Sequence, residues 1–165
     1  KKKLCEKKIF YKEINSFFDF IEKKNNLKII IAAYPRSNYK SNPFNKRKIF
    51  KKKTISLIKH AKIVILHNST AVNYVVLYKK PTIFINSQNY LTHYRLSIDA
   101  LANEFGLKSL DISKEVYNIS NINIKKQKYS NYLKRYIKNH SNKNYDKSYE
   151  IIYKKLPNLF RKFVN

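Results

Sequence analysis

Apolar residues recur along the chain with two periods, one typical of helices and one typical of strands. Residues 28–33, KIIIAA, carry three consecutive isoleucines and no polar face, so we expect a short, fully buried strand there. Before it, five apolar side chains have the spacing that predicts a core-facing helix over residues 10–26. These five are Phe10, Ile14, Phe17, Phe18 and Ile21.

The central segment, residues 54–85, alternates in the same way. Thr54 stands directly before an amphipathic run, and threonine is a common N-cap, so we expect it to cap the first helix of this segment. Lys79-Lys80-Pro81 is expected to end the second helix, because proline cannot continue it. The expected elements are helices over residues 54–60 and 71–78 and strands over residues 63–66 and 82–85.

The remaining segments are assigned from the same signals. The only glycine, Gly106, follows an amphipathic run at a position where a helix end needs a left-handed residue. Residues 38–53 are polar, basic and proline-containing, which is typical of a loop. The other expected elements are helices over residues 91–105, 132–137 and 148–156 and a weak strand over residues 109–112.

Strands separated by single helices form parallel units almost without alternative. We therefore expect an α/β fold in which a parallel sheet is covered by helices on both faces. Residues 1–122 hold this lobe, and residues 123–165 are expected to form a helical segment packed on it. A chain of 165 residues is long enough for one domain of this kind.

A polar cluster, His67-Asn68-Ser69-Thr70, separates the expected strand over residues 63–66 from the helix that follows. At the carboxyl edge of a parallel sheet such a turn meets ligands, and the free N–H groups of the next helix suit an anion. The hydroxyls of Ser69 and Thr70 would add two donors for a phosphate. Capping the helix is the alternative role for either residue, and His67 is equally compatible with a structural role.

A second polar turn, Tyr34-Pro35-Arg36-Ser37, ends the strand expected over residues 28–33. Proline stops the strand, and Arg36 and Ser37 are then placed to donate hydrogen bonds at the same edge of the sheet as Ser69. A solvated loop charge is the alternative for Arg36.

The net charge of +26 would ordinarily point to nucleic acid or to an anionic membrane. Only five of the 36 basic residues are arginine, and the lysines are spread along a chain rich in Asn, Ile and Tyr. This bias is typical of A/T-rich codons, so we ascribe most of the charge to composition. Most aromatic residues fall at expected core positions and no nucleic-acid-binding signature is present, so we expect no specific nucleic-acid partner.

Neither a membrane-spanning run nor a signal peptide is recognisable in the sequence, so we expect a cytoplasmic protein. The single cysteine, Cys5, has no partner for a disulfide or a metal site. The chain contains no methionine, even at its first position, which leads us to expect that it is part of a longer protein.

Three segments together resemble a family: residues 17–26 (FFDFIEKKNN), 29–44 (IIIAAYPRSNYKSNPF) and 53–85, which contains ILHNSTAVNYVVLYKKPTIFI. They resemble the C-terminal, nucleotide-sugar-binding half of the GT-B glycosyltransferases that build bacterial surface carbohydrate such as capsule or lipooligosaccharide. The resemblance covers roughly the first two thirds of the chain, and it implies a Rossmann-like lobe. Glycerophosphotransferases and sialyl- or Kdo-transferases have similar layouts, so the donor sugar stays open.

In such enzymes a Ser-Ser or Ser-Thr turn usually holds the donor phosphate, which here implies Ser69 and Thr70, with Asn68 and His67 beside them. The residue before the strand-ending proline is often histidine, whereas this chain has Tyr34, whose hydroxyl can still donate. The resemblance implies a nucleotide-sugar donor as substrate, a glycan acceptor and no cofactor. No Asp-x-Asp metal motif is present.

No acidic residue occupies a motif that assigns it as the catalytic base, and Asp19 and Glu22 are expected on the solvated face of the first helix. A GT-B enzyme also needs a second half that holds the acceptor. Three other functions remain open: a basic nucleic-acid-binding domain, a lobe of a sugar-nucleotide epimerase, and a lobe that recruits an enzyme to anionic lipid at the inner face of the membrane.

Overall fold

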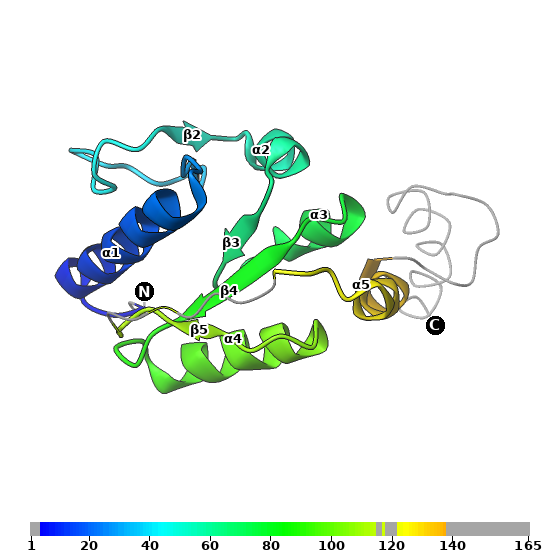
Figure 1. The fold of residues 1–165 in the computed structure, drawn as a ribbon. Coiled ribbons are helices and arrows are strands. Elements are labelled where there is room, and N and C mark those ends of the chain that lie inside the picture. The colour runs from blue at the N-terminus through cyan, green and yellow to red at the C-terminus, as the bar shows by residue number, and fades with distance from the viewer. Residues whose placement is uncertain (1–3, 115–116, 118–121, 138–165) are drawn as a thin grey trace, which may run out of the picture.

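Helices and short parallel strands alternate along the chain, as Figure 1 shows. The computed structural model describes residues 4–114, 117 and 122–137. The first elements are α1 (Lys7–Asn25), β1 (Ile31–Ala33), β2 (Ile49–Lys51), α2 (Thr54–His60), β3 (Val64–Leu66) and α3 (Val72–Leu77). They are followed by β4 (Thr82–Asn86), α4 (Thr92–Glu104), β5 (Leu110–Asp111), α5 (Lys126–Tyr132) and a π-helical turn η1 (Leu133–Ile137).

All strand pairs in the described residues are parallel, which confirms the expected α/β class. The strands form two small sheets, a pair β1–β2 and a triplet β3–β4–β5 with β4 at its centre. In the triplet Ile65 is paired with Ile83, and Ile85 is paired with Leu110. The sequence had led us to expect one sheet, because the spacing of strands and helices does not specify which strands pair.

Strand β4 is buried along its whole length and divides the hydrophobic core into two clusters. Side chains alternate between the two faces of a strand, so Ile83 and Ile85 pack toward α1 while Phe84 packs toward α3 and α4. Figure 1 shows α1 on one side of this sheet and α4 on the other. The triplet is therefore covered on both faces.

Helix α1 carries the apolar stripe expected from the sequence. Phe17 is fully buried, and Ile14, Phe18 and Ile21 are nearly so. The helix ends at Asn26, which has left-handed dihedral angles, and two lysines in the last turn complement the helix dipole. It begins three residues earlier than the apolar stripe, because the periodicity marks only the buried face.

Two further elements follow the sequence closely. Helix α4 covers most of residues 91–105, and Gly106 has φ +64° directly after it, as the expected left-handed position requires. Toward the C-terminus, α5 begins six residues before the expected helix. Tyr129 and Tyr132 of α5 pack into the cluster that holds Phe84 and Phe105. The helix expected over residues 148–156 lies outside the described residues.

The structure also contradicts the expectations for three local segments. The strand at residues 28–33 is shorter than expected and belongs to a two-stranded sheet, so Ile30 is 48% exposed. The expected loop over residues 38–53 contains β2, which pairs with β1. Thr54 is the first residue of α2 and makes no side-chain cap hydrogen bond, since Lys53 occupies the N-cap position.

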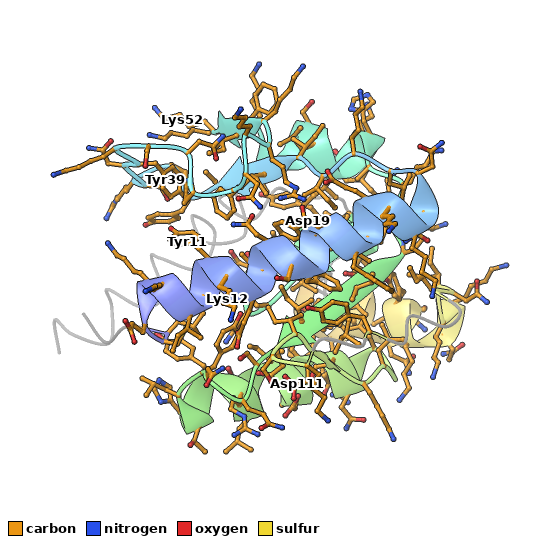
Figure 2. The ribbon with its side chains drawn as sticks, turned by 60° about the vertical axis from the view of Figure 1, so that its left-hand side comes forward. Tyr11, Lys12, Asp19, Tyr39, Lys52 and Asp111 are labelled. Carbon is orange, nitrogen blue, oxygen red and sulfur yellow. The ribbon has the colours of Figure 1, made fainter. Side chains whose placement is uncertain are left out.

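A buried arginine joins α1 to the segment between β1 and β2. The side chain of Arg47 is only 6% exposed. Its Nη2 donates hydrogen bonds to the carboxylates of Asp19 and Glu22, and the distance to Glu22 Oε2 is 2.7 Å. Its Nη1 donates to Asn15 Oδ1 at 3.2 Å, and its guanidinium lies over the ring of Phe18 at 5.4 Å from the centroid. Asp19 and Glu22, expected to be solvated, are therefore ion-pair partners; Figure 2 shows Asp19 on α1.

We predict that Arg47→Ala lowers the free energy of unfolding by about 2 kcal/mol. Hydrogen bonds to charged groups contribute about 1.5–3 kcal/mol each, but Asp19 is 60% exposed and Glu22 30% exposed, so solvent recovers part of the loss. Urea unfolding measures the change. The control is Lys48→Ala, since Lys48 is exposed in the same segment. An equal loss in both variants would contradict this account.

A second prediction concerns pH. Burial raises the pKa of Glu22, but the hydrogen bonds from Arg47 and from the Ile29 N–H, with the charge of Arg47, outweigh it and lower the pKa below 4.5. The ionised carboxyl therefore stabilises the fold above its unfolded pKa, and this contribution is lost as pH falls through the folded pKa. Glu22→Gln should destabilise at about pH 7 and much less at about pH 3. The measurement is the urea midpoint of Glu22→Gln and of the unaltered protein at each pH. An equal difference between the two proteins at both pH values would refute this account.

Candidate functional site

The turn between β3 and α3 carries four polar residues at the carboxyl end of a sheet strand. Ser69 Oγ accepts a hydrogen bond from Ala71 N at 3.2 Å, while the carbonyls of Ser69 and Thr70 accept from Val72 N and Asn73 N, both at 3.1 Å. The first N–H groups of α3 are thus already paired within the turn. The expectation that they face a ligand freely is wrong, because the helix opens with a tight i to i−3 turn.

The hydroxyl hydrogens of this turn remain available. Ser69 Oγ uses a lone pair in its bond to Ala71 and can still donate. Thr70 is exposed, and its hydroxyl has no hydrogen-bond partner among the described residues. Two hydroxyl groups therefore stand next to each other after β3. Ser69 stabilises the turn and Thr70 does not. The N-cap position of α3 is Ala71, with no side-chain cap hydrogen bond, and the phosphate role of Ser69 and Thr70 stays a prediction.

The two residues before Ser69 are His67 and Asn68. Asn68 Nδ2 donates to Ser97 Oγ at 2.9 Å, which ties the turn to α4. His67 is half-buried, and burial lowers the pKa of its imidazole. His67 is therefore neutral at about pH 7 and adds no positive charge to this turn.

The second predicted group follows β1. Ser37 N donates to Tyr34 O at 2.9 Å and closes a turn through Pro35 and Arg36. Tyr34 is 63% exposed, and Arg36 is exposed with no ion pair in the described part of the chain. This turn and the one carrying Ser69 follow strands of different sheets, and no hydrogen bond between described residues joins them. Each group lies at a strand end, but the two strands belong to different sheets, so the expectation that Arg36 and Ser37 share a sheet edge with Ser69 is wrong.

The structure adds a polar network at the carboxyl end of β4 that we did not predict. Ser87 is 1% exposed and its hydroxyl donates to Glu13 Oε2 of α1 at 2.8 Å, and Asn89 Nδ2 donates to the other carboxylate oxygen. On the opposite side, the buried amide of Asn86 donates to Asp99 Oδ1 of α4 at 2.8 Å. Both helices that flank β4 are thereby bonded to the end of this strand.

The signal for this network was present in the sequence. Residues 86–89 are Asn-Ser-Gln-Asn, a polar run directly after a buried strand, which is the same pattern as the turn after β3. The partners Glu13 and Asp99 lie 74 and 13 residues from their bonding partners, so spacing alone does not identify them.

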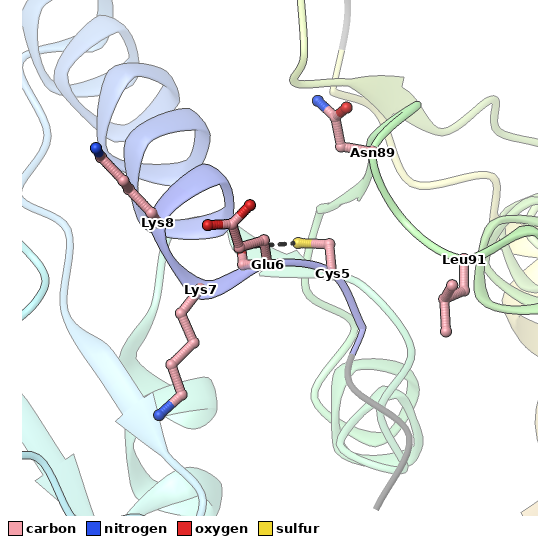
Figure 3. Close-up of a pocket in the computed structure, with 6 residues that line it drawn as sticks. All are labelled: Cys5, Glu6, Lys7, Lys8, Asn89 and Leu91. Atoms are coloured by element: carbon pink, nitrogen blue, oxygen red, sulfur yellow. Dashed lines mark hydrogen bonds between the residues drawn. The ribbon is translucent and has the colours of Figure 1, made fainter.

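A hollow of about 660 Å³ adjoins this strand end, as Figure 3 shows. Its lining comes from the segment before α1, the start of α1 and the loop before α4: Cys5, Glu6, Lys7, Lys8, Asn89 and Leu91. Burial raises the pKa of the Cys5 thiol, so Cys5 is not a thiolate nucleophile at neutral pH. None of the ligand-binding residues predicted from the sequence, which lie in residues 34–37 and 67–70, lines this hollow.

No group of three or more His, Cys, Asp or Glu side chains in the described part could hold a metal ion. Within the same part of the chain, no helix is both long and apolar enough to cross a membrane.

No protein-family model, curated protein or solved structure matches this chain. The resemblance to the GT-B enzymes therefore remains a prediction based on residues of this sequence.

We predict that Ser69 and Thr70 differ in their effect on stability. Ser69→Ala removes the acceptor for Ala71 N and should lower the free energy of unfolding by about 1 kcal/mol. Thr70→Ala removes an exposed hydroxyl without a partner in the described residues and should change it by less than about 0.5 kcal/mol. Urea unfolding of the two single variants provides the comparison, and equal losses would contradict the hydrogen-bond assignment.

Proposed function

We propose that this chain is the Rossmann-like, donor-nucleotide-binding lobe of a GT-B glycosyltransferase in bacterial surface carbohydrate synthesis. One observation carries the proposal: Ser69 and Thr70 present two adjacent hydroxyl donors between β3 and α3, at the carboxyl end of a parallel strand. Ligands of open parallel sheets bind at that edge. The residues of this turn are also those that the family resemblance assigns to the donor phosphate.

Arg36 follows β1, a strand of the other sheet, and therefore does not contribute to this turn. One further feature supports an anionic ligand at the Ser69 turn. The carbonyl and amide groups of the Ser69 turn are bonded internally, so the hydroxyls are held on a fixed backbone. Fixed donors stabilise a developing charge without reorganising during the reaction.

The chemistry of such a lobe is electrostatic. A nucleoside mono- or diphosphate gains negative charge as it leaves the sugar, and hydroxyl donors at the phosphate lower the energy of that step. Neutral His67 would add a hydrogen bond. We assign no catalytic base, and the acceptor would bind to the second half of a GT-B enzyme.

The proposal predicts that the 165-residue chain binds CMP or UDP and that the double variant Ser69→Ala, Thr70→Ala binds it roughly ten- to a hundredfold more weakly. Each hydroxyl contributes about 0.5–1.5 kcal/mol net, and more toward a charged acceptor. Isothermal titration calorimetry on protein that melts cooperatively measures the affinity. No sugar transfer is expected from the lobe alone.

The matched control removes two hydroxyls elsewhere, in Ser16→Ala, Thr92→Ala. Ser16 lies exposed on α1 and Thr92 lies exposed at the start of α4. Nucleotide affinity should be unchanged in this variant. If the Ser69, Thr70 variant is folded and binds the nucleotide as well as the unaltered protein, then the Ser69 hydroxyl only stabilises the turn, and the proposed function loses its main support.

A further inference from the structure

A second hollow, of about 760 Å³, lies on the outer side of α2. It extends from the end of β2 along the exposed face of α2 and is bounded by Tyr74 of α3. Its volume is within the range of about 300–1,000 Å³ typical of small-molecule sites. The lining residues are Lys52, Lys53, Thr54, Ile55, Ser56, Lys59, His60 and Tyr74. None belongs to the Ser69 turn.

The charged side chains that line this hollow are all basic. Lys52, Lys53 and Lys59 contribute three ammonium groups, and no acidic residue lines the hollow. In the described part of the chain the ion pairs involve only Arg47 and Arg135, so these lysines have no carboxylate partner there. Like charges placed together repel, and a multivalent anion relieves that repulsion.

Local structure holds several of these groups in place. The ammonium of Lys53 lies 5.4 Å from the centroid of the Phe50 ring, a cation–π contact. His60 Nδ1 bonds the carbonyl of Ser56 at 2.8 Å, which fixes the imidazole on the face of α2 that lines the hollow. Tyr74 packs partly against the core cluster of α3 and α4. Figure 2 shows Lys52 beside β2.

We propose that this hollow binds the diphosphate group of a soluble small molecule. Three lysines match a ligand that carries two or more negative charges, and the hydroxyls of Thr54, Ser56 and Tyr74 are donors for its oxygens. This site goes beyond the proposed donor site, since the two share no residue. Lysine binds phosphate as a point charge, so charge rather than shape determines selectivity here.

The test titrates inorganic pyrophosphate into the 165-residue chain at physiological salt. The variant Lys52→Gln, Lys53→Gln, Lys59→Gln should bind about tenfold more weakly, since each exposed charge contact is modest. The matched control is Lys12→Gln, Lys108→Gln, Lys114→Gln, which removes the same charge from exposed positions on α1 and on both sides of β5. It should bind within about twofold of the unaltered protein. Equal weakening in both variants would show that only the overall charge attracts pyrophosphate.

A second measurement needs no variant. Pyrophosphate should protect Lys52, Lys53 and Lys59 from an amine-acylating reagent, read by mass spectrometry, while Lys12, Lys108 and Lys114 keep their reactivity. The protection should persist in Ser69→Ala, Thr70→Ala, which separates this site from the donor site. Vesicles containing phosphatidylglycerol form a further arm. Protection by vesicles but not by pyrophosphate would replace the soluble ligand with a lipid surface and refute the proposal.

Discussion

The complete burial of β4 is the constraint on which the rest of the described structure depends. A strand with apolar side chains on both faces needs cover on both sides, and Ile83 and Ile85 receive it from α1 while Phe84 receives it from α3 and α4. The polar residues that follow the strand then lie where it leaves the core. Ser87 bonds α1 through Glu13, and Asn86 bonds α4 through Asp99, so the two helices are fixed to the same strand end.

The smaller sheet is attached in a different way. Strands β1 and β2 have three residues each and bury little, and Arg47 joins the segment between them to α1 through Asp19 and Glu22. A charged group with 6% exposure is tolerated because both its partners retain contact with solvent, which reduces the desolvation cost of the pair. The position of the Tyr34 turn, which follows β1, therefore depends on this ion pair as well as on apolar packing.

The sequence predicted the helices whose apolar period is long and regular, α1 and α4. It also predicted the apolar strands β3 and β4 and the left-handed Gly106. It failed where the structure depends on pairing between distant segments. Strand β2 lies in a basic stretch and has only Ile49 and Phe50 as a signal, and Arg47 is indistinguishable in sequence from its lysine neighbours. The position of the Ser69 turn was predicted correctly. The hydrogen bonds that the first N–H groups of α3 make within this turn were not predicted, because periodicity carries no information on how a helix begins.

The two anion sites proposed for this chain would bind their ligands through different interactions. At Ser69 and Thr70 uncharged donors sit on a backbone fixed by its own hydrogen bonds, so binding there depends on direction and distance and is little affected by salt. In the hollow along α2, the ammonium groups of three lysines would supply charge with few directional constraints, and screening would weaken their attraction as ionic strength rises. A protein of net charge +26 attracts anions over its whole surface. Under the proposed function, specific binding of a nucleotide would therefore depend on the first kind of site. The excess lysines would mainly increase the local concentration of ligand from which that site selects.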